Sequence, residues 1–160
     1  ETAAPRLHPE EPLARARNRA WTDYVPTFAS AVSNTAYADS EEEFTARAAK
    51  IAGPFGKLDE ALAKRGNAGP YFNGLKFSLV DAAYAPFLQR YTFMDRLRPL
   101  GIIGKFPHLA AWCDALLAAA AVKESTVANF EAVWQKNLIL RGRWLGKFVS
   151  PSVAGAAATA

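Results

Sequence analysis

Apolar side chains recur at helical spacing along most of the chain, and no stretch alternates apolar and polar residues as a strand would. The most regular stripe repeats at intervals of three and four residues and consists of Phe44, Ala48, Ile51, Phe55, Leu58 and Leu62. A stripe of this kind predicts a helix with one buried face. Gly53-Pro54 lies inside it. We therefore expect one helix that bends at this dipeptide, rather than two helices, and that ends at Gly66.

Three further stripes predict helices on either side of this one. The first begins near Glu11 or Pro12, bends near Pro26, and is expected to bury Leu13, Ala20, Trp21, Tyr24, Phe28 and Val32. The last two stripes comprise Leu109, Trp112, Cys113, Leu116, Leu117 and Ala120, and then Val127, Phe130, Trp134 and Leu138. Together with a helix that begins after Ser78, these patterns predict an all-α fold.

The start of that helix carries the most specific signal in the chain. Ser78 is followed three residues later by Asp81, the spacing of a capping box in which each side chain accepts a hydrogen bond from the other residue's backbone N–H. The helix is expected to run from Leu79 to about Leu97, with a bend at Pro86. Its core-facing residues are expected to be Val80, Ala83, Phe87 and Met94. Loss of the cap in Asp81→Ala should cost about 1 kcal/mol.

The capping box lies within a longer recognisable segment. Residues 71–86 read YFNGLKFSLVDAAYAP, with an aromatic-Asn-Gly turn before the box and an alanine-rich helix after it. Residues 106–112 read FPHLAAW and open the following helix. Together these two motifs resemble the C-terminal helical domain of cytosolic glutathione transferases, nearest to the bacterial omega-like or beta-like groups. The resemblance covers about residues 1–148 and implies a right-handed bundle of five to six helices.

The resemblance also divides the chain. Residues 1–10 look like the linker that follows the family's N-terminal thioredoxin-like domain, and residues 11–148 correspond to the C-terminal helical domain. In this interpretation the thioredoxin-like domain itself is missing from the chain. Residues 149–160 are small and featureless, so we expect a disordered tail.

Candidate site residues follow from the same resemblance. In the family, the second substrate lies in an apolar pocket that is partly walled by the first, third and last helices of this domain. Carried onto this sequence, the candidates for that wall are Phe28, Tyr37, Arg90, Tyr91 and Trp134. An apolar substrate needs concave apolar surface and one or two polar groups that orient it, which Arg90 or Tyr91 would supply. Packing in the core or on the surface is the competing interpretation for each of the five.

No catalytic residue and no metal site is expected in this chain. In the family, a Ser, Tyr or Cys of the thioredoxin-like domain activates the glutathione sulfur, and that domain also holds most of the glutathione. Cys113 lies on the same apolar stripe as Trp112 and Leu116, which favours a buried and inert thiol. No zinc-binding spacing, phosphate-binding loop or Gly-x-Ser-x-Gly motif occurs.

Composition excludes several other classes. The 160 residues, 51% hydrophobic and 21% charged, are typical of one globular domain, and the longest apolar runs are far too short to cross a bilayer. The net charge of +4 comes from scattered Lys and Arg residues, which argues against nucleic-acid binding. A single cysteine and no signal peptide favour the cytoplasm.

Two interpretations of function remain open. In the first, the chain is part of a glutathione transferase whose full-length form uses glutathione as co-substrate, acts on a small electrophile and is a homodimer. In the second, it is a non-catalytic helical module of the same fold, of the kind joined to translation factors and synthetases for assembly. The sequence upstream of Glu1 would discriminate between them. An unrelated helical bundle would require both motifs to be coincidences.

Overall fold

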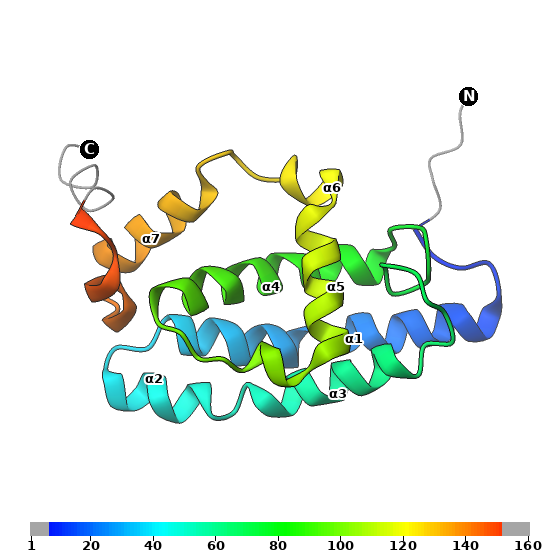
Figure 1. Ribbon diagram of the computed structural model, residues 1–160, viewed down its shortest axis with the longest axis horizontal. Coiled ribbons are helices and arrows are strands. Elements are labelled where there is room, and N and C mark those ends of the chain that lie inside the picture. Colours follow the sequence, from blue (N-terminus) through cyan, green and yellow to red (C-terminus); the bar gives the residue numbers. More distant parts are fainter. Residues whose placement is uncertain (1–6, 152–160) are drawn as a thin grey trace.

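The structure is a computed structural model that describes residues 7–151 (Figure 1). Within this range it is all-α, as expected. Its elements are α1 (Pro12–Ala36), α2 (Glu41–Ala48), α3 (Ala52–Ala63), α4 (Leu79–Leu97), the 3₁₀ turn η1 (Ile103–Lys105), α5 (Pro107–Ala118), α6 (Ala120–Lys123), α7 (Phe130–Leu140) and the 3₁₀ turn η2 (Trp144–Phe148). The expected linker at residues 1–10 and tail at residues 149–160 lie partly outside the described range, and their boundaries stay predictions.

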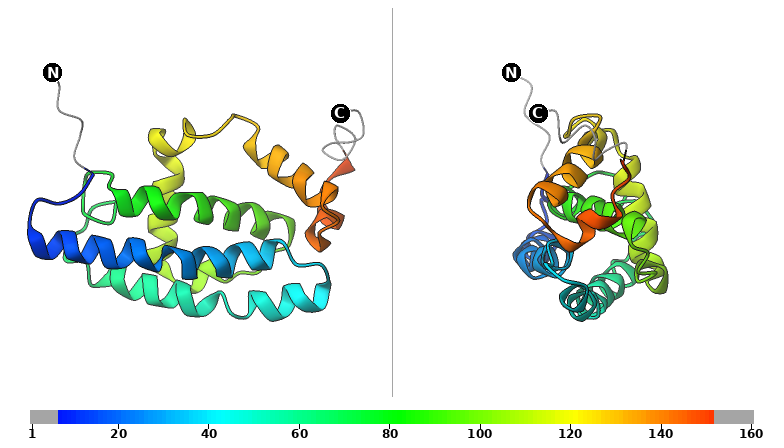
Figure 2. Two further views of the ribbon diagram at one scale, coloured as in Figure 1. Left: turned by 180° about the vertical axis from the view of Figure 1, so that it is seen from behind. Right: turned by 90° about the vertical axis from the view of Figure 1, so that its left-hand side faces the viewer.

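The long helices run lengthwise and α4 lies in their middle. Figure 1 shows α1, α4 and the consecutive pair α2 and α3 along the long axis, with α5 crossing α4 and α1. The end-on view in Figure 2 shows α4 surrounded by α1, α3, α5 and α7. A central helix must bury more than one face, and α4 buries eight residues, among them Tyr84, Leu88 and Tyr91.

An aromatic cluster joins three of these helices. The ring of Phe28 on α1 stacks on Phe55 of α3 at 5.2 Å between ring centroids, and it meets the edge of Tyr84 on α4 at 5.0 Å. Phe55 also meets Tyr91 at 4.9 Å in an edge-on contact. Stacked and edge-on pairs are the arrangements that aromatic rings prefer, so this cluster fixes how α1, α3 and α4 pack.

The expected single bent helix is in fact two helices. The chain leaves α2 after Ala48 and passes through short turns, in which the Lys50 N–H donates to the Arg47 carbonyl at 3.0 Å. Pro54 explains the break, because it has no N–H for the Lys50 carbonyl and its ring would collide with that carbonyl in a continuous helix. Our sequence argument placed the irregularity at the proline, whereas it lies one turn earlier. The six residues of the stripe are nevertheless all buried.

Several residues at the ends of the predicted stripes are exposed. Leu13 and Val127 have 77% and 61% of their surface exposed, and Ala20 and Ala120 are also exposed. Val127 precedes the first residue of α7. Spacing alone identifies a face of a helix but not how far a neighbour covers it. The prediction of burial is wrong for these four residues.

The predicted bounds of α4 are confirmed, and two of its four predicted core positions are correct. Val80 and Met94 are in the core as expected, whereas Ala83 and Phe87 are only half-buried. Both α1 and α4 continue through an internal proline, Pro26 and Pro86 respectively. No helix within residues 7–151 is long and apolar enough to span a membrane.

Candidate functional site

The beginning of α4 is organised around the carboxylate of Asp81, which has no exposed surface. Its Oδ2 accepts hydrogen bonds from the Ser78 N–H at 2.8 Å and from the Ser78 hydroxyl at 2.5 Å, within a capping box. Its Oδ1 accepts from the Phe72 N–H at 2.9 Å and from the Trp112 indole N–H at 2.7 Å. One buried carboxylate therefore connects the loop before α4, the first turn of α4 and the middle of α5.

The bond from Trp112 joins the two motifs that carry the family resemblance. Sequence reasoning assigned Asp81 a local role and missed Trp112 as its partner, because nothing in the spacing of the two motifs shows that they meet. Each carboxylate oxygen of Asp81 already accepts two hydrogen bonds. It has no free lone pair for a substrate proton, so this geometry suits folding and not general-base catalysis.

Three of the five candidate pocket residues lie in the core instead of on a pocket wall. Phe28 and Tyr91 have no exposed surface, and Trp134 has 3%. Trp134 packs against Phe93 of α4, with 5.7 Å between ring centroids. The physical reason is that these aromatic rings lie on the faces by which α1 and α7 pack against α4. In the described residues, none of the three presents surface to a ligand.

The Tyr91 hydroxyl contacts residues on both sides of the loop that follows α4. It accepts a hydrogen bond from the Ile103 N–H at 3.2 Å and lies 3.5 Å from Oδ1 of Asp95. Burial raises the pKa of Tyr91 to about 12, with a smaller contribution in the same direction from the Asp95 charge. A phenol of this kind remains protonated at neutral pH and does not serve as a proton acceptor there.

Tyr37 lies at a junction between distant parts of the chain. It follows the last residue of α1, is half-buried, and its carbonyl accepts from the Arg143 guanidinium at 3.4 Å. The adjacent Trp144 N–H donates to the Ala38 carbonyl at 3.0 Å. Tyr37 thus belongs to the contact between the end of α1 and η2, and it is not brought together with Arg90.

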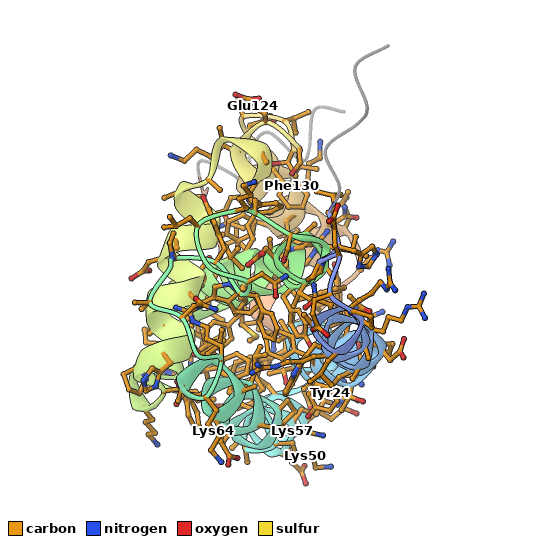
Figure 3. All side chains as sticks on the ribbon, turned by 90° about the vertical axis from the view of Figure 1, so that its right-hand side faces the viewer. Tyr24, Lys50, Lys57, Lys64, Glu124 and Phe130 are labelled. Carbon is orange, nitrogen blue, oxygen red and sulfur yellow. The ribbon has the colours of Figure 1, made fainter. Side chains whose placement is uncertain are left out.

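Arg90 lines a cavity. This cavity has a volume of about 370 Å³, lies between α4 and α6, and is lined by Phe77, Ala82, Ala85, Pro86, Gln89, Arg90, Ala121, Val122, Ser125 and Thr126. The Arg90 guanidinium donates to the Pro86 carbonyl at 2.7 Å and lies 5.2 Å from the ring centroid of Phe130. Phe130, labelled in Figure 3, is the first residue of α7. These two contacts hold the Arg90 guanidinium between α4 and α7. We name the cavity, with its lining residues, the Arg90 cavity.

The Arg90 cavity combines an apolar wall with a few polar groups. Pro86 has no N–H, so the carbonyl of Ala82 lacks the donor that a continuous helix would provide four residues later. Ala82, Gln89 and Arg90 all line this cavity. Small-molecule sites typically have this composition, with hydrophobic surface and a small number of convergent polar groups.

Two other candidate reactive groups, the Cys113 thiol and the Tyr84 phenol, are not activated as nucleophiles or bases. Burial raises the pKa of the Cys113 thiol to about 12, and burial likewise raises the pKa of the Tyr84 phenol. Cys113 is therefore a protonated thiol at neutral pH, as its position on an apolar stripe predicted. Among residues 7–151 no group of three or more His, Cys, Asp or Glu side chains is placed to hold a metal ion.

Comparison with known proteins agrees with the two motifs. The family profile described as "Glutathione S-transferase, C-terminal domain" matches residues 41–115. Glutathione S-transferase L1 of Arabidopsis thaliana is 34% identical over 114 residues, which cover 70% of this chain and 44% of that relative.

Two solved structures have the same arrangement of helices. A Tau class glutathione S-transferase from mango, Mangifera indica, is similar with a TM-score of 0.70 and 25% identity, over 84% of this chain and 63% of the mango protein. Glutathione transferase Omega 3C from Trametes versicolor is similar with a TM-score of 0.66 and 25% identity, over 78% of this chain and 55% of the fungal protein.

Fold, capping segment and sequence matches together define a glutathione transferase-like helical domain. The chain carries a helical domain of the glutathione S-transferase C-terminal type. It spans less than half the length of the Arabidopsis relative.

Proposed function

We propose that this chain walls the hydrophobic pocket for the second substrate of a full-length glutathione transferase. The reaction of that protein would be glutathione conjugation or glutathione-dependent thiol transfer. The observation that carries the proposal is the Arg90 cavity, where a guanidinium held by Pro86 and Phe130 lies beside apolar surface. A small electrophile with a polar substituent would place its apolar part on this wall and its substituent near Arg90.

The protonation states in this domain indicate that activation of the glutathione sulfur takes place elsewhere in the full-length protein. Activating the glutathione sulfur requires a group that stabilises a thiolate, and burial keeps Cys113, Tyr84 and Tyr91 protonated. The thiol chemistry and most of the glutathione contacts are therefore assigned to a thioredoxin-like domain. The full-length protein would be a cytoplasmic homodimer. In this proposal Phe28, Tyr91 and Trp134 support the pocket from behind, while Tyr37 remains a separate candidate.

The test uses the full-length protein with Arg90→Met and a control, Arg141→Met, which removes an exposed cation after α7. With chlorodinitrobenzene as the electrophile, Arg90→Met should raise the KM for the electrophile about fivefold and leave the KM for glutathione unchanged. The control should leave both values unchanged. If both variants have the KM values of the wild type, Arg90 does not contact the substrate. A full-length protein without glutathione-dependent turnover that still assembles with a partner would support the non-catalytic module instead.

A further inference from the structure

The surface between α1 and the consecutive pair α2 and α3 is hollowed at two places. The first hollow has a volume of about 310 Å³ and is lined by Arg17, Trp21, Lys57, Glu60, Ala61 and Lys64. The second has a volume of about 340 Å³ and is lined by Ser30, Ala31, Asn34, Arg47 and Lys50. We name this surface, with both hollows, the lysine seam.

Three exposed lysines of the seam follow one another at intervals of seven residues, at positions 50, 57 and 64. Lys57 lies within α3, Lys64 follows its last residue, and Lys50 lies in the turn before it. Seven residues are close to two helical turns, so residues at this interval share one side of a helix and lie about 10 Å apart along it. Figure 3 shows the three lysines at the edge formed by α2 and α3, with Tyr24 of α1 beside them. They form a row along the seam.

Two cations of the seam have carboxylate partners on their own helix. The Lys64 ammonium lies 2.5 Å from a carboxylate oxygen of Glu60, and the Arg47 guanidinium lies 3.1 Å from one of Glu43. Both pairs are exposed to solvent to a large extent, and exposed pairs of this kind contribute little free energy. A carboxylate from outside can therefore compete for these two cations.

The other cations of the seam have no such partner. Within the described part of the chain, Lys50, Lys57 and Arg17 form no ion pair. The Lys57 ammonium lies 4.2 Å from the ring centroid of Tyr24, a contact that fixes its position without neutralising it. Glu60 is the single carboxylate among the residues that line the two hollows. The seam therefore carries an excess of positive charge.

The arrangement of the charges favours one kind of anionic partner. Carboxylates seven residues apart on an α-helix repeat at the same interval of about 10 Å as the lysines. A second copy of the chain is disfavoured, because a two-fold axis centred at Lys57 would bring Lys50 of one copy toward Lys64 of the other. A single-stranded nucleic acid stacks its bases on open aromatic faces, whereas Lys57 already covers one face of Tyr24.

We propose that the lysine seam docks an acidic amphipathic helix of a partner protein, with carboxylates that recur every seven residues on one face. Lys50, Lys57 and Lys64 pair with this row of carboxylates, and Arg17 contributes a further cation from the other side of the seam. Such a helix lies along a groove between two helices, which is a common mode of peptide recognition. This interaction is independent of the Arg90 cavity and of any glutathione chemistry.

The first experiment measures binding of two labelled, alanine-based helical peptides to the 160-residue chain by fluorescence anisotropy. The peptides have the same composition. In the first, the glutamates recur every seven residues on one face, and in the second they are spread around the helix. The first peptide should bind at least fivefold more tightly, and its affinity should fall at high salt. Equal affinities, or no binding of the first peptide, overturn the proposal.

The second experiment locates the contact with charge-matched variants. The test variant combines Lys50→Gln, Lys57→Gln and Lys64→Gln. The control removes the same amount of charge at exposed positions elsewhere and combines Lys105→Gln, Lys123→Gln and Lys147→Gln. The test variant should bind the first peptide at least tenfold more weakly than the wild type, and the control should bind it within about twofold. Thermal unfolding verifies that both variants are folded. Equal weakening in both variants means that net charge alone attracts the peptide, which overturns the proposal.

Three further outcomes overturn the proposal in favour of another occupant. Tighter binding of a thymidine oligonucleotide than of the first peptide would identify a nucleic acid. Sedimentation with phosphatidylglycerol vesicles, without binding of the peptide, would identify a membrane surface. A chain that sediments as a dimer only while the three lysines of the row are present would identify a second copy.

Discussion

Helix α4 has an aspartate near each end, and the two carboxylates hold their loops in different ways. Asp81, in the first turn, has no exposed surface and accepts four hydrogen bonds from Ser78, Phe72 and Trp112. Asp95, in the last turn, is half-buried. Its Oδ1 accepts from the Leu100 N–H at 2.7 Å and the Gly101 N–H at 3.3 Å.

The comparison separates a long-range connection from a local one. Asp81 joins its own loop to α5, thirty-one residues later in the chain, through Trp112. Asp95 orders only the loop that follows its own helix. Removal of the buried carboxylate leaves buried N–H groups without acceptors, whereas water can replace much of what Asp95 provides. We therefore expect the two aspartates to differ strongly in their contribution to stability.

The largest expected effect is that of Asp81→Ala. A capping role alone predicts a loss of about 1 kcal/mol, but four buried donors, the N–H groups of Phe72, Ser78 and Trp112 and the Ser78 hydroxyl, would lose their acceptor. The free energy of unfolding should therefore fall by about 3 kcal/mol or more, measured by urea denaturation of the 160-residue chain. A loss no larger than that of a simple cap would mean that the contacts with Phe72 and Trp112 contribute nothing.

Asp95→Ala is the matched variant at the other end of α4. It should lower the free energy of unfolding by about 1 kcal/mol, because the freed N–H groups of Leu100 and Gly101 can bind water. Amide hydrogen exchange should accelerate at Leu100, whose bond to Asp95 is the shorter one. If Asp95→Ala is as destabilising as Asp81→Ala, the distinction between the two ends fails.

The smallest expected effect appears at alkaline pH, through Tyr91 beside Asp95. Burial raises the pKa of Tyr91 to about 12, from an ordinary value of 10.0 that the unfolded chain retains. The unfolded state therefore loses this proton first, and the contribution of Tyr91 to stability is complete below pH 10 and is lost as the pH rises toward 12. Tyr91→Phe should flatten the fall in the free energy of unfolding between pH 10 and 12, measured by denaturant titration. Identical pH slopes for Tyr91→Phe and the wild type would show that the phenol is not shifted.

The two ends of α4 also differ in how far the sequence predicted them. The start of α4 was predictable because a capping box is a local pattern, in which Ser78 and Asp81 have a fixed spacing. The loop contacts of Asp95 have no such spacing rule. The partnership of Asp81 with Trp112 depends on how α5 crosses α4, which is a property of tertiary packing.

The candidate site was predicted less well than the helices, for a related reason. Phe28, Tyr91 and Trp134 were assigned to a pocket wall by helix position, and their rings instead pack into the core. Spacing does not distinguish an aromatic ring that faces a substrate from one that faces another helix. Arg90 does line a cavity, since a guanidinium is rarely buried without a partner, but its role at a substrate site stays a prediction.

The most direct test of the connection between the two motifs is a double-mutant cycle of Asp81→Ala and Trp112→Phe, read out as the free energy of unfolding. Trp112→Phe keeps an aromatic ring in the core and removes the indole donor that lies 2.7 Å from Asp81. If Asp81 links the loop and the start of α4 to α5, the two losses should be non-additive, with a coupling of about 1 to 2 kcal/mol. Additive losses, with a coupling of about zero, would contradict that link.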